Sequence, residues 1–317
     1  MQNQQVTVGV IGGGVWGRAL SNLARHNGHL VKGWSRSSDR TLVETLKGCD
    51  VILSAVSMAG VQPVLDQLKG IEIPHQTILV SATKGVEFKT DHDCPVQTAS
   101  QFWQATFPDH SVVVLSGPNL SQEIEQGRPA ATVVASHTMA AAETIQSLLS
   151  SANFRVYTNV DPLGVELGGT LKNIIAIAAG SCDALQLGTN AKAALVTRGL
   201  SEMIRIGTRW GANAETFYGL SGLGDLLATC NSSLSRNYQL GYQLGEGKTV
   251  AEALTTLRGT AEGINTTRVI VQVTDQWSIS APISHQVHRL IQGEVTPQAA
   301  VEALMLRSMK PEQNLLL

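Results

Sequence analysis

A glycine-rich stretch near the N-terminus most constrains the fold of this chain. Residues 6–20 read VTVGVIGGGVWGRAL, so a short apolar run leads into three glycines, and Gly17 follows three residues later. A strand, the pattern G-x-G-x-x-G and a helix form the first unit of a dinucleotide-binding fold. In that fold Gly12 permits the tight turn, Gly14 lets the backbone approach a pyrophosphate, and Gly17 lets the helix pack close to the sheet. A purely structural strand–turn–helix could carry the same glycines.

The rest of the first half alternates between strand-like and helix-like runs. Short apolar, β-branched runs predict further strands at 29–34, 50–56, 76–82, 111–117 and 130–136. Apolar residues at helical spacing predict helices at 14–28, 59–69 and 139–150. Strands that alternate with helices predict a mostly parallel, doubly wound sheet.

From about residue 165 the chain reads as helices. Runs such as VELGGTLKNIIAIAAGSCDALQLG carry apolar residues at helical spacing, and no strand pattern competes with them. The length of 317 residues exceeds one typical domain. We therefore predict an α/β fold with two domains: a Rossmann-type dinucleotide-binding domain over residues 1–158 and an all-helical substrate and catalytic domain over residues 159–317.

Charge and composition exclude several classes of protein. The net charge of −2 argues against a nucleic-acid surface or an anionic membrane as partner. The opening MQNQQ lacks the cationic start and apolar segment of a signal peptide, and the longest apolar runs are too short to cross a bilayer. The four cysteines are widely spread and form no CxxC, so neither a metal site nor a redox pair is expected. These features predict a cytoplasmic enzyme without a metal.

The end of the second predicted strand bears on the choice of dinucleotide. An NAD site usually places Asp or Glu there to bond the ribose 2′-hydroxyl. Here the strand ends in GWSRSSDR, which offers Arg36 between two serines and no carboxylate before Asp39. An arginine flanked by hydroxyls suits a 2′-phosphate, so we predict that NADP(H) is preferred and that NAD(H) is possible. A solvated surface arginine is the alternative interpretation.

Three later stretches carry side chains suited to catalysis. VSATKGVE places Lys84 after a strand, at the edge where ligands bind in open α/β sheets. ELGGTLKNIIAIAAG places Lys172 in an almost wholly apolar helix, where an ammonium group is expensive unless it is paired or used. A lysine that extends its amine to the surface is the alternative. GLGDLLATC places Asp225 and Thr229 one turn apart on a helix face.

The loop that follows ends in Ser235, Arg236 and Asn237. An arginine beside serine and asparagine is suited to bind a phosphate group. By itself such a cluster could equally be ordinary protein surface.

Six motifs, in order along nearly the whole chain, resemble the bacterial-type NAD(P)-dependent glycerol-3-phosphate dehydrogenases. They are GGGVWG, SATKGVE, SGPNLSQEI, VELGGTLKNIIAIAAG, GLGDLLATC…SRN and AEGINT. The resemblance implies an oxidoreductase that reduces dihydroxyacetone phosphate to sn-glycerol 3-phosphate with NAD(P)H. We expect this enzyme to bind no nucleic acid and to insert into no membrane. Such an enzyme would supply sn-glycerol 3-phosphate for glycerophospholipid synthesis. We also expect a homodimer, although the sequence does not determine the oligomeric state.

The resemblance implies roles for the matching residues. Lys172 is similar to the family's catalytic proton donor and acceptor, and Lys84 to a second lysine close to substrate and nicotinamide. We expect Asp225 to orient Lys172 or to bond a substrate hydroxyl. The further substrate contacts expected are Gly117, Asn119, Thr229, Ser235, Arg236 and Asn237. The expected cofactor contacts include the glycine loop and Arg36. They are Gly12, Gly14, Val15, Trp16, Gly17, Arg36, Lys84, Ser121, Arg236 and Glu262.

Two departures limit what the resemblance carries over. Val15 stands where the family usually has a small hydroxyl residue, which removes one hydrogen bond to the pyrophosphate. Only a short connection joins Trp34 to Asp50, where the family has a far longer one, so adenine contacts are not carried over.

Two rival functions also stay open. One is a two-domain reductase for a hydroxyacid or ketopantoate-like substrate, which shares the glycine loop and a helical-domain lysine; the GLGDLLATC…SRN block argues against it. The other is a non-catalytic cofactor-binding sensor, which would not need Lys84, Lys172 and Asp225 together.

Overall fold

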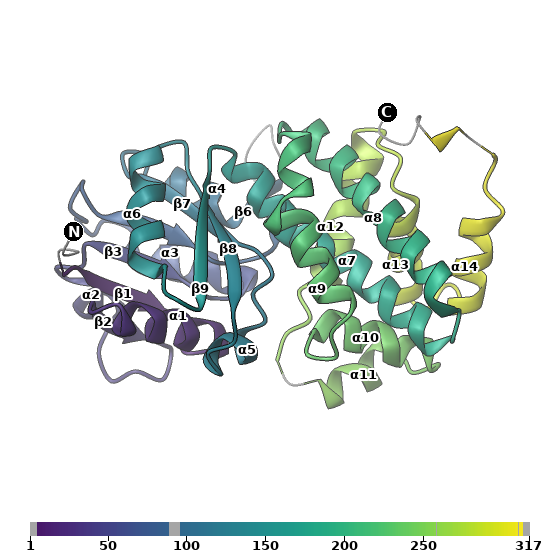
Figure 1. The fold of residues 1–317 in the computed structure, drawn as a ribbon, viewed down its shortest axis with the longest axis horizontal. Helices are drawn as coiled ribbons and strands as arrows, with labels where there is room; N and C mark the ends of the chain where they lie inside the picture. The colour runs from purple at the N-terminus through teal and green to yellow at the C-terminus, as the bar shows by residue number, and fades with distance from the viewer. Residues whose placement is uncertain (1–4, 89–95, 258, 310, 313–317) are drawn as a thin grey trace. The chain divides into compact units, whose positions relative to one another are not determined.

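The protein divides into two compact units in a computed structural model that describes residues 5–88, 96–257, 259–309 and 311–312. The first unit comprises Met1–Lys84 and Gln97–Glu166, and the second comprises Gly85–Val96 and Leu167–Leu317. The division falls within one long helix, α7 (Pro162–Ala184). Figure 1 shows strands and helices in the first unit and mostly helices in the second, so the predicted fold class is confirmed.

A seven-stranded sheet in the order β2-β1-β3-β4-β7-β8-β9 forms the centre of the first unit. Its first five strands in that order are parallel, β8 runs antiparallel to β7, and β9 is parallel to β8. Each run predicted as a strand forms one. The strands of the sheet are β1 (Thr7–Ile11), β2 (Leu30–Trp34), β3 (Val51–Ser54), β4 (Ile78–Ser81), β7 (Val112–Ser116), β8 (Ala130–Ala135) and β9 (Phe154–Asn159).

Three strands were not predicted from the sequence. β9 carries alternating buried and exposed side chains, so it lacks the continuous apolar run of the central strands. β5 (Val86–Phe88) and β6 (Val96–Thr98) form a separate two-stranded sheet and are too short to produce a periodic signal.

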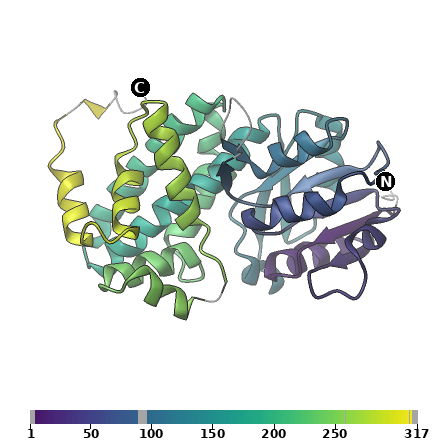
Figure 2. The ribbon, with the colours of Figure 1, turned by 180° about the vertical axis from the view of Figure 1, so that it is seen from behind.

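Helices cover both faces of the sheet, as Figures 1 and 2 show from opposite sides. Successive strand residues point to opposite faces, so Val10 packs in one core and Ile11 in the other. The first core includes α1 (Val15–His26) and α6 (Met139–Leu149). The other core includes α2 (Leu42–Leu46), α3 (Met58–Leu68) and α4 (Ala99–Thr106). The short α5 (Ser121–Glu125) follows β7.

The second unit is built from helices, which Figure 1 draws from teal to yellow. Besides its part of α7, the unit contains a 3-10 turn and a π-helical turn, η1 (Ala214–Tyr218) and η2 (Leu220–Gly224). No helix within the described residues has the length and apolar character needed to span a membrane. The α-helices are α8 (Gly188–Trp210), α9 (Asp225–Cys230), α10 (Arg236–Gly245), α11 (Val250–Thr256), α12 (Gly263–Gln276), α13 (Pro282–Ile291) and α14 (Pro297–Met305).

Candidate active site

The glycine loop lies between β1 and α1, and two of its glycines are required by packing. Gly12 has φ +119°, and a methyl group added to it would lie 2.7 Å from the carbonyl oxygen of Ala55. A methyl group added to Gly17 would lie 2.0 Å from the carbonyl oxygen of Gly12. At Gly12 the positive φ and the backbone of Ala55 exclude a side chain, and at Gly17 the close approach of α1 to the turn excludes one.

Gly14 differs, because nothing in the protein requires a glycine there. An added methyl group would have nothing within 4 Å, and Gly14 is the N-cap of α1 with no side-chain hydrogen bond to the first turn. Val15 is exposed, and Trp16 packs partly against the core. The backbone N–H groups of an uncapped helix N-terminus that no other part of the protein covers are able to bind an anion. These residues fit the pyrophosphate of a dinucleotide.

The turn after β2 lies beside this loop. A methyl group added to Gly13 would lie 3.0 Å from Cβ of Ser35. Ser35 donates its backbone N–H to Oγ of Ser38 at 2.9 Å, and Oγ of Ser35 and Oγ of Ser37 are 3.0 Å apart. Arg36 is exposed and makes no hydrogen bond or ion pair to another residue that the structure describes. The serines therefore hold the turn, and the guanidinium stays available to a ligand.

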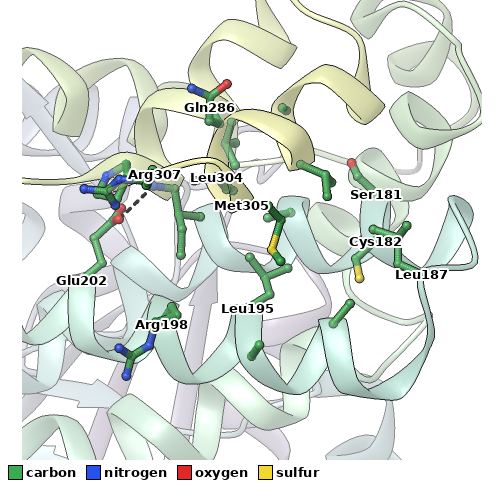
Figure 3. A pocket seen from close by; sticks show the side chains of 18 of the residues that line it. Ser181, Cys182, Leu187, Leu195, Arg198, Glu202, Gln286, Leu304, Met305 and Arg307 are labelled. Carbon is green, nitrogen blue, oxygen red and sulfur yellow. Dashed lines mark hydrogen bonds between the residues drawn. The ribbon is translucent and has the colours of Figure 1, made fainter. Parts of the chain in front are cut away.

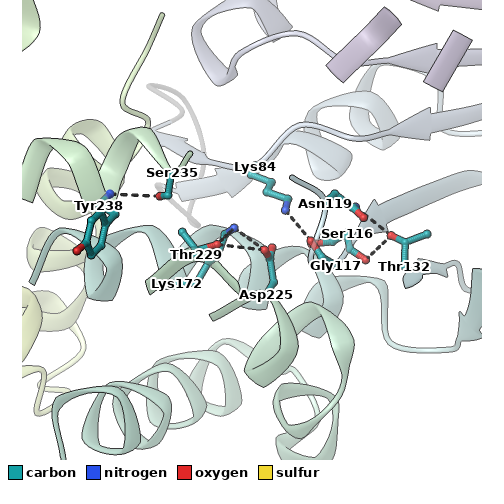
Figure 4. Close-up of polar contacts among 10 residues, drawn as sticks. All are labelled: Lys84, Ser116, Gly117, Asn119, Thr132, Lys172, Asp225, Thr229, Ser235 and Tyr238. Atoms are coloured by element: carbon teal, nitrogen blue, oxygen red, sulfur yellow. Dashed lines mark hydrogen bonds and ion pairs between the residues drawn. The ribbon is translucent and has the colours of Figure 1, made fainter. Parts of the chain in front are cut away.

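A second group of predicted residues gathers where β4 and β7 end side by side (Figure 4). Nζ of Lys84 donates to the carbonyl oxygen of Gly117 at 3.1 Å. Nδ2 of Asn119 donates to Oγ1 of Thr132 at 3.0 Å, and that hydroxyl donates to the carbonyl oxygen of Ser116 at 3.0 Å. Thr132 lies on β8, outside every quoted motif, so its role here was not predictable from the sequence.

The side-chain oxygen of Asn119 is also able to accept a hydrogen bond. Its Oδ1 is buried and has no hydrogen-bond partner among the described residues. A buried amide oxygen in this state is destabilising unless a donor reaches it, and a ligand hydroxyl would satisfy it. Ser121, the remaining predicted residue of this stretch, is the first residue of α5.

In the helical unit, Lys172, Asp225 and Thr229 form one buried cluster (Figure 4). Nζ of Lys172 lies 2.5 Å from Oδ1 of Asp225 and 2.5 Å from Oγ1 of Thr229, and that hydroxyl lies 3.2 Å from Oδ1 of Asp225. Lys172 is 7% exposed and Asp225 1%. The amine therefore does not extend into solvent, and its charge is balanced within the unit.

Glycines bring the helices of this cluster together. A methyl group added to Gly168 of α7 would lie 2.8 Å from the carbonyl oxygen of Ser221, and one added to Gly222 would lie 2.1 Å from the carbonyl oxygen of Phe217. Both contacts involve η2, the π-helical turn directly before Asp225. The motifs contain these glycines, but the sequence alone did not reveal that they set the approach of α7 to Asp225.

The predicted phosphate-binding residues begin α10. Ser235 is its N-cap, and Oγ of Ser235 accepts from the backbone N–H of Tyr238 at 3.2 Å. Arg236 is exposed, makes no hydrogen bond or ion pair within the described residues, and has its guanidinium against Gly259. A cation at a helix N-terminus is unfavourable on its own, and an anion bound there would relieve it.

Asn237 has a structural task that was not predicted. Its Oδ1 accepts from the backbone N–H of Gly263 at 3.0 Å, at the start of α12, where Glu262 is the N-cap residue. A methyl group added to Gly263 would also lie 3.1 Å from the carbonyl oxygen of Asn173. Asn237 thus joins the start of α12 to α10. The start of α12 lies against α7 at Asn173, the residue after Lys172.

The two units therefore offer different chemistry. The first has an uncapped helix N-terminus beside an exposed arginine, and the second has a buried ammonium–carboxylate pair and a cationic helix N-terminus. Within the described residues, no group of three or more His, Cys, Asp or Glu side chains could hold a metal ion. Fold and site together define an NAD(P)-dependent oxidoreductase with a Rossmann-type unit and a helical unit.

Comparison with known proteins gives the family. The models for the N-terminus and C-terminus of NAD-dependent glycerol-3-phosphate dehydrogenase match residues 38–142 and 161–302. The chain therefore belongs to this family, as the motifs predicted. The glycerol-3-phosphate dehydrogenase (NAD(P)+) of Nostoc sp. is 61% identical over 98% of this chain and 100% of its own. That of Acaryochloris marina is 58% identical over 96% of each chain.

A solved structure of the same family has a closely similar fold. The glycerol-3-phosphate dehydrogenase of Coxiella burnetii has a TM-score of 0.89 and 32% identity, covering 96% of this chain and 99% of that one. Membership of this family removes both rivals left open by the sequence, the hydroxyacid or ketopantoate-like reductase and the non-catalytic sensor.

Proposed function

We propose that the protein interconverts dihydroxyacetone phosphate and sn-glycerol 3-phosphate with NAD(P)(H), as its family membership implies. The observation that carries the proposal is the buried cluster of Lys172, Asp225 and Thr229 in the helical unit. A ketone reduction needs a proton at the carbonyl oxygen, and a lysine held in a water-poor site is suited to provide it.

In our mechanism Lys172 is the proton donor for reduction and the proton acceptor for oxidation. Its ammonium group stabilises the negative charge that develops on the substrate oxygen, then gives that oxygen a proton. The 2.5 Å contact with Asp225 supports an orienting role for the carboxylate, and Thr229 fixes the amine from a second direction. When bound, the dinucleotide exchanges the hydride with the substrate carbon.

Residues of the first unit would assist at the reacting end of the substrate. Lys84 is held by the carbonyl oxygen of Gly117, which keeps its charge at the carboxyl edge of the sheet. The buried Oδ1 of Asn119 is suited to accept a hydrogen bond from a substrate hydroxyl.

The substrate phosphate would bind at the start of α10. Arg236 supplies the charge, and the N–H groups of the first helical turn, with Ser235 and Asn237, supply further donors. Because the phosphate is remote from the reacting carbon, its binding energy would serve to position the ketone.

For the dinucleotide, we propose that Gly12, Gly14 and Gly17 shape the pyrophosphate site at the N-terminus of α1. Backbone N–H groups would do the work of the hydroxyl that Val15 lacks. The further contacts proposed are Trp16, Arg36, Lys84, Ser121, Arg236 and Glu262. The division into a dinucleotide-binding domain, 1–158, and a substrate and catalytic domain, 159–317, stays part of this proposal, as do a cytoplasmic location, a homodimer and a contribution to glycerophospholipid synthesis.

The decisive experiment follows NADPH oxidation by the purified protein with dihydroxyacetone phosphate. We expect turnover that ceases without the ketone, and slower turnover with NADH at equal concentration. Ketopantoate and 2-ketoacids, assayed in parallel, should give no turnover. Activity with one of these acids and none with dihydroxyacetone phosphate would overturn the proposal.

Arg36 decides the proposed preference for NADP(H). Arg36→Ala should raise KM for NADPH roughly tenfold, the worth of one charge-assisted hydrogen bond, and leave KM for NADH within about twofold. Arg40→Ala, a neighbouring exposed arginine, is the matched control and should change neither value. Equal changes of KM for both cofactors in Arg36→Ala would contradict a 2′-phosphate contact.

A further inference from the structure

The helical unit contains a large cavity that none of the candidate active-site residues lines. Its volume is about 820 Å³, and its walls come from the C-terminal part of α7, from α8, and from α13, α14 and the residues after α14 (Figure 3). This volume is in the range of pockets that hold small-molecule ligands, about 300–1,000 Å³. The family's reaction does not account for it.

Most of the cavity wall is apolar. Leu195 of α8, Val287 and Leu290 of α13, and Leu304 and Met305 of α14 line it. Met305 is 79% exposed, so the apolar surface continues to the cavity mouth. Apolar surface that is hollowed and open to solvent marks a binding site more often than a defect of packing.

Positive charge gathers at one end of the cavity. Arg198 and Arg205 lie on one face of α8 at helical spacing, and Arg307 follows α14. Figure 3 shows Arg198 and Arg307 at the end opposite Cys182. Burial lowers the pKa of Arg205, Glu202 opposes that shift, and the charges of Arg307 and Arg198 add to it, so the three guanidinium groups act on one region.

The nearby carboxylates leave most of the charge of Arg198 and Arg307 for a ligand. Glu202 accepts hydrogen bonds from the backbone N–H groups of Ile283 and Ser284 and from Oγ of Ser284, and burial raises its pKa. Glu312 lies 3.7 Å from Arg198 but is 85% exposed, so this pair is weak. Arg307 makes no hydrogen bond or ion pair within the described residues.

We propose that this cavity binds a long-chain amphiphile with an anionic head group. The alkyl chain lies along the apolar wall formed by α8, α13 and α14, and the head group meets Arg198 and Arg307. A fatty-acid carboxylate and a lipid phosphate share this chemistry, because both join an apolar chain to an anion that arginine binds in a bidentate manner.

Charge complementarity favours this ligand over a second copy of the chain. A two-fold contact would bring the same surface of each copy together. Among the described lining residues Glu202 is the one carboxylate, and it is already used inside the protein. The facing cavity of a second copy would therefore offer these arginines no carboxylate that is not already used, whereas an anionic head group offers a free anion.

The test measures displacement of the fluorescent fatty acid cis-parinarate from the full-length protein, without substrate or dinucleotide, so that its outcome is independent of the proposed reaction. The competitors are dodecanoate, dodecyl phosphate and dodecanol, each below its aggregation limit. We expect at least one of the two anions to displace the probe about tenfold better than dodecanol, the worth of one charge-assisted contact. The stronger anion identifies the head group, and equal displacement by dodecanol would overturn the proposal.

Three variants locate the ligand. Arg198→Ala combined with Arg307→Ala should weaken binding of the stronger anion about tenfold and leave dodecanol within about twofold. Arg209→Ala, an exposed arginine on the same helix outside the cavity, is the matched control. Ala194→Trp, at an exposed lining position, should block the probe by filling the cavity while leaving the circular dichroism spectrum unchanged.

Two outcomes would overturn this location. One is equal weakening by Arg209→Ala and by the double arginine variant. The other is probe binding unchanged in Ala194→Trp together with a loss of dimer in sedimentation, which would make the cavity an interface between copies.

Discussion

At the scale of single residues, Lys172 and Asp225 depend on each other. Each is a buried charge that would be strongly destabilising alone, and their 2.5 Å contact with Thr229 beside it compensates both. Burying such a pair contributes little net stability, because desolvation offsets most of the attraction. A buried pair of this kind therefore points to a chemical role for the lysine.

Lys172→Met should lower kcat by at least about 10³-fold, because the variant cannot donate or accept the proton. NADPH binding, followed by cofactor fluorescence, should stay within about threefold, because Lys172 is not among the proposed dinucleotide contacts. The substitution leaves Asp225 without its ammonium partner, so Lys172→Met with Asp225→Asn is the variant to use if the single one does not fold. Retention of more than a tenth of the wild-type kcat in either variant would refute the proton-transfer role.

Arg236→Ala should lower kcat/KM for dihydroxyacetone phosphate roughly 100-fold, because the phosphate loses a charged, bidentate partner. Because Arg236 is also a proposed dinucleotide contact, both ketones are assayed at saturating NADPH, where the same variant should change kcat/KM for unphosphorylated dihydroxyacetone by no more than about threefold. Arg209→Ala again serves as a control for removal of an exposed arginine. Parallel losses with both ketones would count against a phosphate contact.

At the scale of elements, the π-helical turn η2 presents Asp225 to α7. The turn packs against Gly168 of α7 on one side and contains Gly222, which faces the carbonyl oxygen of Phe217 on the other. π-helical turns recur at functional sites, where they redirect a side chain that a regular helix would place elsewhere. The position of the carboxylate is thus set by backbone contacts of glycines.

Gly222→Ala should lower the free energy of unfolding by about 1–3 kcal/mol, because the added methyl group overlaps backbone that cannot rotate away. It should also lower kcat, because Asp225 must shift with η2. Gly224→Ala is the matched control, since its added methyl group has its nearest neighbour at 3.6 Å. Urea unfolding and steady-state kinetics of both variants test this, and equal effects of the two substitutions would contradict it.

At the scale of the whole molecule, Glu166 and Glu202 are buried carboxyl groups that lie outside the candidate active site, one in each unit. Glu166 of the first unit accepts from the backbone N–H of Ser100 at 2.8 Å and from its hydroxyl, and Glu202 belongs to the second unit. Burial raises the pKa of Glu166 to about 7, although the hydrogen bonds from Ser100 and Thr98 oppose this. Burial also raises the pKa of Glu202. The stability of the protein should therefore fall as such groups ionise.

The pH dependence of unfolding tests this for Glu166. A pKa raised in the folded state means that the folded protein binds the proton more tightly, so the stabilisation is complete below about pH 4.5 and is lost as pH rises through about 7. Across that window the wild type should lose about 3 kcal/mol relative to Glu166→Gln. Glu143→Gln, at an exposed position on α6, should follow the wild type. If the free energy of unfolding of Glu166→Gln falls with pH as much as that of the wild type, other groups cause the pH dependence.

Much of the fold was predictable because strands and helices leave periodic patterns in nearby residues. The central strands appeared as continuous apolar runs, whereas β9, with one exposed face, did not. The candidate site was predictable as a set of residue types, since a lysine in an apolar helix and an arginine beside Ser and Asn are visible locally.

The sequence by itself determined the class of fold, the glycine loop and the set of candidate side chains for the site. Tertiary structure alone decided that Lys172 meets Asp225 and Thr229, that Asn237 holds the start of α12, and that α8, α13 and α14 enclose a cavity with arginines at one end. The physical reason is that periodicity arises from contacts between near neighbours in the chain. These partners are distant in sequence, and the packing of whole helices, often through glycines, brings them together.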